Sequence, residues 1–365
     1  WPFEFGITGD GVIFQRGMIM GQRFNFIIDN PGLYTAGFAS FDSLPIPYRA
    51  VATDLVTGDV VVPDQGNLLR AVRASMAAPG AFPPVQIDDQ ILVDGYLRTM
   101  IPVETVKDMG ADRVIAVHVG WSPGEIPKNT RWGLPDILMQ SNFILTWSNV
   151  VPSLEEADIG LSVSLPDIPL FDLTQAQEAI EAGRTAVDDH LEELLPLALS
   201  EEEYARWSQG VRSWSQDVPI IERITLDNPT MVSDLTITSR VTQAVGDTLD
   251  IPQLQRDLSR VYQLGVFESV DFGLEGQDVT KDLVIRPTEK PYLPWIMRVG
   301  GSYRVTSRHR GEIQLMAHLV RYEFNRLGGE LRTDVALGAV SIGAVEFYQP
   351  LEYSRTLFVS PGVFY

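Results

Sequence analysis

The sequence of 365 residues contains no cysteine, which excludes disulfides and thiolate metal sites. It also lacks an apolar run of about eighteen residues, the length that a transmembrane helix needs. Positive charge is scarce, because 28 Lys and Arg stand against 48 Asp and Glu, and the net charge is −20. An acidic surface of this kind disfavours nucleic acid as a partner and provides no electrostatic attraction to anionic membranes. If the substrate is a lipid, the protein must reach it through apolar contacts.

Asp94 and Gly95 form the most informative pair in the chain. They follow residues 91–93, an apolar run of strand character, and a strand that ends in Asp-Gly brings a carboxylate to the rim of a sheet. Residues 104–109 then predict a helix, and residues 113–119 predict a buried strand. Strand, carboxylate turn, helix and strand in this order predict a βαβ unit of an α/β sheet.

Three segments around this pair resemble the patatin-like phospholipases. They are the strand that ends in Ala52-Thr53-Asp54, the small-residue segment 73–84, and Asp94-Gly95 itself. Each motif is weak alone, but together, in this order and over roughly eighty residues, they are specific. The resemblance implies an α/β sandwich and a lipid acyl hydrolase with a Ser-Asp dyad. In that dyad Asp94 is the general base and Gly95 belongs to its Asp-Gly motif, and the resemblance implies neither a cofactor nor a metal.

The serine of that family lies in a Gly-x-Ser-x-Gly elbow that follows a Gly-rich oxyanion loop, and this sequence contains neither motif. It starts at Trp1 without a methionine, and residues 1–30 resemble the helical middle of the domain, downstream of the elbow. We therefore expect a fragment that lacks the nucleophile and any signal peptide. As it stands, such a fragment cannot hydrolyse an ester by the dyad mechanism.

A serine hydroxyl needs a base within hydrogen-bond reach, and an aspartate at a strand end can be that base. Two positions depart from the family pattern: Tyr96 stands where a small residue is usual, and Met100 lies near the usual asparagine. Two readings of Asp94 therefore stay open, a dyad carboxylate or a structural turn residue. If Asp94 is the dyad carboxylate, two further alternatives stay open, an active full-length enzyme or a degenerate one. Asp54 is expected to be a turn or cap residue, and His118 a core histidine.

Beyond residue 199 the chain changes character. Residues 200–217 predict a linker helix. Residues 218–290 predict the order β-α-α-β-β, which together with the segment from Leu264 to Phe267 resembles a polypeptide-transport-associated (POTRA) domain. Its expected elements are a strand at 220–226, helices at 234–241 and 251–264, and a hairpin of 267–274 with 279–287. The resemblance implies that an extended peptide can add to an edge of its sheet.

Residues 291–365 predict strands with alternating apolar and polar positions. In the strand 331–337 one set of alternate residues is Leu331, Thr333, Val335 and Leu337, and the other is Arg332, Asp334 and Ala336. A transmembrane β-barrel presents lipid and lumen in this way, although a soluble sheet with one buried face has the same pattern. Segments 325–330 and 346–351 resemble the first strands of the antiparallel outer-membrane barrel that follows POTRA domains in bacterial surface antigens. About five strands cannot close a barrel, so we expect a truncation here too.

A patatin-like domain (1–199), a POTRA domain (218–290) and the start of a barrel (291–365) together resemble the patatin-type autotransporters of the type V secretion system. The resemblance implies a phospholipase A-like enzyme in the bacterial outer membrane, with the patatin-like domain periplasmic or exported to the surface. Its substrate would be a phospholipid or another fatty-acyl ester, and outer-membrane lipid would be a further partner. The alternative is a non-enzymatic outer-membrane transport or assembly protein with a degenerate patatin-like domain. A Gly-x-Ser-x-Gly motif upstream would distinguish the two.

Overall fold

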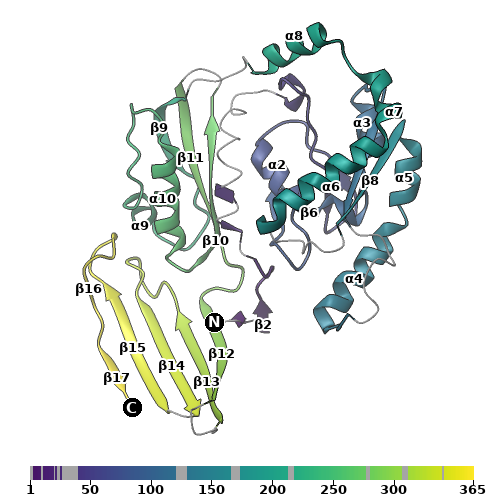
Figure 1. The fold of residues 1–365 in the computed structure, drawn as a ribbon. Coiled ribbons are helices and arrows are strands. Elements are labelled where there is room, and N and C mark those ends of the chain that lie inside the picture. Colours follow the sequence, from purple (N-terminus) through teal and green to yellow (C-terminus); the bar gives the residue numbers. More distant parts are fainter. Residues whose placement is uncertain are drawn as a thin grey trace. The chain divides into compact units, whose positions relative to one another are not determined.

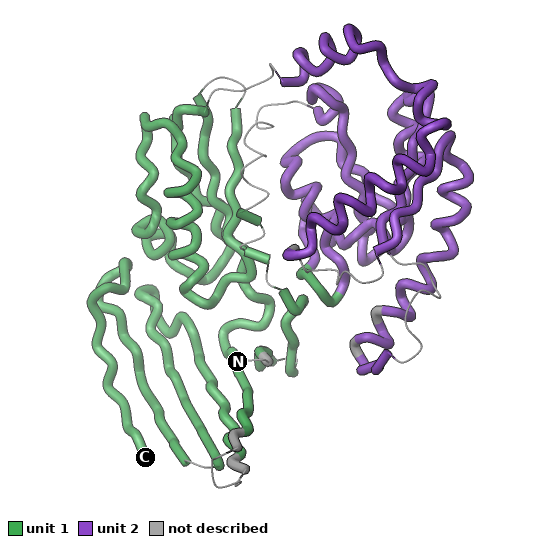
Figure 2. The backbone as a smooth tube through the Cα atoms, viewed as in Figure 1, with its two compact units in different colours: residues 1–38, 80–83, 216–365 green, residues 39–79, 84–215 purple. Residues whose placement is uncertain are grey.

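The structure is a computed structural model. It describes residues 3–9, 11–19, 21–22, 25–26, 40–120, 130–165, 173–212, 218–276, 280–305, 311–338 and 341–365. The chain forms two compact units, which Figure 2 shows in two colours. Unit 1 contains residues 1–38, 80–83 and 216–365, and unit 2 contains residues 39–79 and 84–215. Residues 1–38 thus cluster with the C-terminal part of the chain. The domain families expected on either side of residue 199 stay a prediction.

Unit 2 contains a four-stranded antiparallel sheet in the order β4-β3-β6-β5. Its strands are β3 (Ala52–Asp54), β4 (Val60–Val61), β5 (Val85–Ile87) and β6 (Gln90–Asp94). Helix α2 (Leu68–Ser75) is capped by Asn67, whose side chain accepts the backbone N–H of Arg70. Ala74 of this helix packs against Ala52 and Leu92 in one apolar cluster. The two central strands of this sheet, β3 and β6, are therefore the strands that contain the motifs.

The expected βαβ unit lies elsewhere in the chain. Strand β7 (Ile115–Gly120) does not pair with β6 but runs parallel to β8 (Ile159–Ser164). The crossover between them contains α4 (Leu134–Trp147) and α5 (Val150–Glu156). The prediction that β6 and β7 share a sheet is therefore wrong among the described strands. The prediction of a fully buried β7 is also wrong, because the side chains of one face are exposed: Ile115, Val117 and Val119.

The remaining helices of unit 2 are short or moderately long. They are α3 (Val103–Asp108), α6 (Ala176–Asp189), α7 (Leu191–Leu194) and α8 (Glu201–Arg212), with 3₁₀ turns η2 (Phe41–Ser43), η3 (Gly95–Leu97), η4 (Leu173–Gln175) and η5 (Leu195–Leu197). Helix α8 confirms the helix expected within residues 200–217, of which residues 213–217 lie outside the described part. No helix in the described ranges is both long and apolar enough to cross a membrane.

Residues 218–290 of unit 1 form the strands and helices that the sequence predicts for them. They are β9 (Ile220–Leu226), α9 (Asp234–Thr238), α10 (Ile251–Tyr262), β10 (Phe267–Glu275) and β11 (Thr280–Glu289). The sheet order is β10-β11-β9, with β9 parallel to β11. Leu254, Leu258 and Val261 form the buried stripe of α10 and pack in one cluster with the sheet. The POTRA assignment itself stays a prediction.

The second part of unit 1 is an antiparallel sheet in the order β16-β15-β14-β13-β12-β1-β2, with β17 paired to β15. Figure 1 shows β12, β13, β14 and β15 side by side. The strands are β1 (Phe3–Thr8), β2 (Gly11–Phe14), β12 (Trp295–Val305), β13 (Gly311–Arg321), β14 (Glu330–Gly338), β15 (Ile342–Pro350), β16 (Phe358–Val359) and β17 (Gly362–Phe364). The expectation that residues 1–30 are helical is wrong for β1 and β2, which extend this sheet.

The segment after β2 lies along the outer edge of β10. The side-chain amide of Gln22 donates to the carbonyl oxygen of Val270 (2.9 Å), and its oxygen accepts the N–H of the same residue (2.8 Å). Asn25 donates to the Asp271 carboxylate (2.9 Å). Arg16 forms an ion pair with the buried Glu268. Gln22 therefore occupies the edge position that a neighbouring strand would otherwise fill.

Candidate functional site

The strand-end carboxylate lies where the sequence predicts it. Asp94 is the last residue of β6 and is paired with Ala52 of β3, and its backbone N–H donates to the carbonyl oxygen of Ala77 (3.1 Å). Its side chain accepts the backbone N–H of Tyr96 (3.0 Å) and so starts the 3₁₀ turn η3. The carboxyl position is thus fixed by two strands and a turn.

Gly95 is required by the close approach of another backbone. A Cβ atom at this position would lie 2.4 Å from the carbonyl oxygen of Val51, which is shorter than any normal contact. Gly95 is itself buried. The Asp-Gly sequence therefore has a steric cause, because any side chain at residue 95 would push the carboxylate turn away from β3.

Burial raises the pKa of the Asp94 carboxyl to about 6, and the hydrogen bond from Tyr96 opposes this rise. No ion pair to Asp94 is found within the described ranges. A carboxylate with a pKa close to neutral can take a proton from a poor nucleophile near pH 7 and return it later. The site can therefore act as a general base.

Tyr96, the bulky departure from the family pattern, is held from a distant helix. Its hydroxyl accepts a hydrogen bond from the side-chain amide of Asn142 in α4 (2.7 Å). Burial, and then the nearby Asp94 carboxylate, raise the pKa of the Tyr96 hydroxyl. No sequence pattern singles out Asn142, because it belongs to no motif and lies in a helix 46 residues from Tyr96.

The other singled-out residues of unit 2 have structural positions. Asp54 is buried and accepts the N–H of Val56 (2.8 Å), as expected of a turn residue. His118 is buried in β7, 3.3 Å from the Ser162 hydroxyl and edge-on to Trp147, as expected of a core histidine. Across the described ranges, no three His, Asp or Glu side chains are placed to hold a metal ion.

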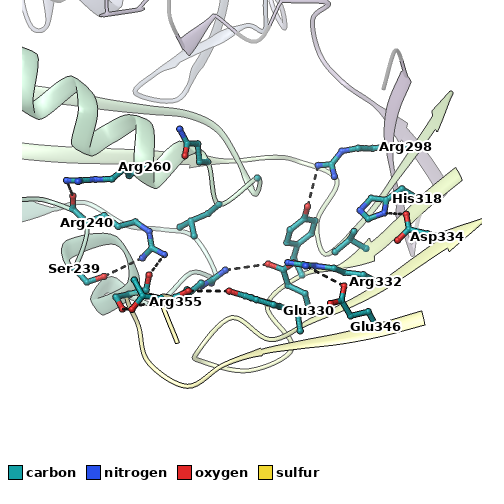
Figure 3. Close-up of a pocket in the computed structure, with 18 of the residues that line it drawn as sticks. Ser239, Arg240, Arg260, Arg298, His318, Glu330, Arg332, Asp334, Glu346 and Arg355 are labelled. Atoms are coloured by element: carbon teal, nitrogen blue, oxygen red, sulfur yellow. Dashed lines mark hydrogen bonds and ion pairs between the residues drawn. The ribbon is translucent and has the colours of Figure 1, made fainter. Parts of the chain in front are cut away.

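One face of the C-terminal sheet is polar and lines a pocket of about 930 Å³ (Figure 3). The charged groups that the sheet contributes to this pocket form pairs. Arg298 of β12 donates to Glu4 of β1 (2.7 Å), Arg332 of β14 donates to Glu330 (2.9 Å), and His318 of β13 lies 2.6 Å from Asp334. The opposite wall comes from the ends of α9 and α10 and from the residues before β16. The polar groups of this sheet thus face the rest of unit 1.

The other face of the same sheet is apolar. Directly paired residues of an antiparallel sheet point to the same side, so the register defines rows across the strands. One row contains Ile7, Trp295, Arg321, Leu331 and Phe347. Another row, eight residues further along β12, pairs Tyr303 with Ile313. The large side chains between them include several that are at least 40% exposed: Leu315 (59%), Val335 (41%), Leu337 (58%) and Val345 (47%). The sheet therefore turns its apolar side toward the outside.

Comparison with known proteins adds a likeness that is limited to part of the chain. Residues 21–107 match the family model "Patatin-like phospholipase". An uncharacterised NTE family protein of Mycobacterium bovis is 41% identical over 86 residues, 24% of each chain. The neuropathy target esterase of Drosophila melanogaster is 33% identical over 105 residues, 28% of this chain and 7% of that one.

Among solved structures, BamA from Haemophilus ducreyi lacking POTRA domains 1–3 is 15% identical. The alignment has a TM-score of 0.31 and covers 41% of this chain and 28% of that one. The chain spans about a quarter of the length of the mycobacterial relatives that it matches. The segment that contains β3, β6 and Asp94 is therefore similar to the patatin-like phospholipases, a family of lipid hydrolases.

Proposed function

We propose that the chain contributes the general base of a lipid acyl hydrolase whose substrate is a phospholipid or another fatty-acyl ester. The observation that carries this proposal is Asp94, a partly buried carboxylate with a pKa of about 6 at the end of a strand. It lies within the segment that is similar to patatin-like phospholipases. The proposal requires a serine nucleophile that is not identified among these 365 residues.

In the proposed reaction Asp94 accepts the proton of the serine hydroxyl while the serine oxygen attacks the ester carbonyl. The proton then passes to the leaving alcohol as the ester C–O bond breaks. Water hydrolyses the acyl-enzyme in the same way, with Asp94 again as the base. Each cycle therefore consumes one water and releases one alcohol and one fatty acid.

The test is ester hydrolysis by the intact natural protein with Asp94→Asn. Loss of the general base should lower the rate by about 10²–10⁴. Asp89→Asn, an exposed carboxylate in the turn before β6, is the matched control and should retain activity. Near-normal hydrolysis by a folded Asp94→Asn protein would remove Asp94 from the mechanism.

A non-enzymatic role is the second proposal, and Tyr96 is the observation that favours it. This side chain is held by Asn142 next to the Asp94 turn, where a small residue would leave more room. Labelling the intact protein with a fluorophosphonate serine probe distinguishes the two. Labelling of one serine supports the hydrolase, and absence of labelling supports a degenerate domain in a transport or assembly protein.

We also propose that the C-terminal sheet lies in a membrane, as part of an outer-membrane barrel. Its apolar face supports this, because eight residues between the Trp295 and Tyr303 rows span about 27 Å at 3.3–3.4 Å per residue. Barrel strands are tilted by about 35–45°, so this length covers about 20 Å of the apolar band of about 25 Å in transmembrane barrels. Fractionation of bacteria that express the intact protein is the test. A freely soluble cytosolic protein would contradict the autotransporter arrangement.

An extended peptide is a further proposed partner of the sheet β10-β11-β9, by addition of a strand to its edge. On the β10 side this edge is already occupied at Val270 by Gln22. A peptide that adds there must displace Gln22 or pair beyond it. Titration of the intact protein with extended peptides, followed by hydrogen exchange of β10, would test this.

A further inference from the structure

Arg321 differs from three other arginines of unit 1. Arg298, Arg332 and Arg355 belong to the polar pocket, and each forms an ion pair with a carboxylate. Arg321 is paired in register with Trp295 on one side and Leu331 on the other, which places it on the apolar face. In the described part of the chain no carboxylate forms an ion pair with it.

Aromatic rings hold the Arg321 guanidinium in place. It lies 3.8 Å from the centre of the Phe324 ring, and Phe324 meets Phe347 edge-on at 5.7 Å. Phe324 is 45% exposed. One guanidinium nitrogen, Nη1, is buried without a hydrogen-bond partner among the described residues. Protein atoms enclose Nη1 itself, but Nε and Nη2 are not among the enclosed atoms and also have no hydrogen-bond partner among the described residues. Arg321 is only partly buried, so a group from outside can be bound through these two nitrogens.

The position of Arg321 along the strand points to what that group is. Arg321 is the last residue of β13, in the row that contains Trp295 and Phe347. Aromatic side chains gather where the hydrocarbon of a bilayer meets the head groups, and arginine extends to the same level. At that level the abundant anionic acceptor is the phosphate of a phospholipid, whose oxygens match a guanidinium.

We propose that Arg321 binds the phosphate of a membrane phospholipid at the border of the apolar face. This inference rests on the membrane placement proposed above. The acyl chains of the bound lipid would lie along the rows beyond Arg321, the first of which contains Met297, Leu319 and Val345. Arg321 would then mark one boundary of the bilayer. This boundary lies at the end of the sheet where β12 begins and β13 ends.

The test uses native mass spectrometry of the intact natural protein in a maltoside detergent, which contains no phosphate. The protein is titrated with dioleoyl phosphatidylglycerol and, in parallel, with dioleoyl monogalactosyl glycerol, which has the same chains without a phosphate. We expect the wild type to retain the phospholipid preferentially. Arg321→Gln should weaken phospholipid binding about tenfold or more, because a charge-assisted contact is lost.

Two further variants separate the possible outcomes. Arg326→Gln, an exposed arginine in the following turn, should bind as the wild type does, and Arg321→Lys should keep much of the binding if charge is what matters. Equal binding of the two lipids by the wild type, or unchanged binding by Arg321→Gln, would overturn the phosphate site. In those cases the membrane placement would stand if the protein still required detergent. A protein that stays soluble without detergent and binds neither lipid would overturn the membrane placement itself.

Discussion

The Tyr96 hydroxyl accepts a hydrogen bond from Asn142, and this bond ties the Asp94 turn to helix α4 across 46 residues of sequence. Tyr96→Phe and Asn142→Ala should each lower the free energy of unfolding by about 1 kcal/mol, a typical value for one hydrogen bond. The double variant should lose clearly less than the sum of the two, since both remove the same bond. Chemical denaturation of the four proteins measures this, and strict additivity would show that the bond contributes nothing.

Gly95→Ala places a methyl group against the Val51 carbonyl oxygen. We expect it to destabilise unit 2 by about 1–3 kcal/mol, the usual cost of overpacking, and to abolish activity by moving the Asp94 turn. Gly183→Ala in α6 is the matched control, because nothing lies within 4 Å of the added carbon. That change should stabilise the helix by up to about 1 kcal/mol. Thermal unfolding of the two variants should therefore show shifts of opposite sign.

The raised pKa of Asp94 predicts two pH dependences. Hydrolysis needs the ionised base, so its rate should rise as the pH increases through about 6. Stability should change in the opposite direction. Because the folded pKa lies above the ordinary value of 3.8, the protonated carboxyl favours folding at low pH, and this contribution is lost as the pH rises through about 6.

Comparison of the wild type with Asp94→Asn isolates the contribution of the Asp94 carboxyl to stability. Between pH 4 and pH 8 the wild type should lose up to about 3 kcal/mol relative to the variant, at 1.36 kcal/mol for each pKa unit. Thermal midpoints of both proteins across this range provide the measurement. A constant difference would mean that the Asp94 carboxyl is not buried as described.

A buried network joins β1 to the rest of its sheet. Glu4 accepts hydrogen bonds from Lys290 (2.6 Å), Tyr292 (2.8 Å) and Arg298 (2.7 Å). Burial alone would raise the pKa of Glu4, but Lys290 and Arg298 hold it below its usual value. The stability that this pairing provides should therefore be present above pH 4.5 and be lost as the pH falls below it.

Glu4→Gln should cost about 3–5 kcal/mol, because it leaves the buried Lys290 and the largely buried Arg298 without their carboxylate. The matched control is Glu156→Gln, which breaks a half-exposed pair with Lys107. That change should cost no more than about 1 kcal/mol. Unfolding in lipid or detergent would compare the two. Equal costs would mean that the Glu4 network is solvated.

Gln22→Leu should expose the edge of β10 without removing apolar contacts. The Val270 N–H, which donates to Gln22, should then exchange with solvent much faster. Gln177→Leu on the exposed face of α6 is the control and should leave this exchange unchanged. Hydrogen exchange with mass spectrometry checks both, and unchanged protection of Val270 in Gln22→Leu would show that another group covers the edge.

Local patterns predicted the parts of the fold that depend on neighbours in sequence. The apolar run before Asp94-Gly95 placed the carboxylate at a strand end, and the periodicity of Leu254, Leu258 and Val261 gave α10 almost to the residue. The pairing of strands was harder. A run such as residues 115–119 shows that a strand forms, but its partner β8 follows only after two helices. The sequence of β1 likewise contains no sign that its partner is β12.

The candidate site likewise contains residues that local sequence patterns identify and residues that they do not. Asp94 and Gly95 belong to a motif that can be read locally, while Asn142 reaches the site from a distant helix. The steric need for Gly95 depends on Val51 of the neighbouring strand segment, which no spacing rule reveals. Motif reading therefore identifies the base, and only the folded chain identifies what surrounds it.

The pairing of β1 with β12 has a consequence for the order of folding. Glu4 and Arg298 are 294 positions apart in the chain, yet they lie opposite each other in one sheet. All of unit 2 is thus inserted between two adjacent strands. During synthesis β1 cannot pair with β12 until most of the chain has been made. Contacts of such long range in sequence form slowly. Prior folding of the inserted unit would shorten the effective loop and reduce the entropy lost on closing it. The seam between β1 and β12 should therefore be the last part of the sheet to form.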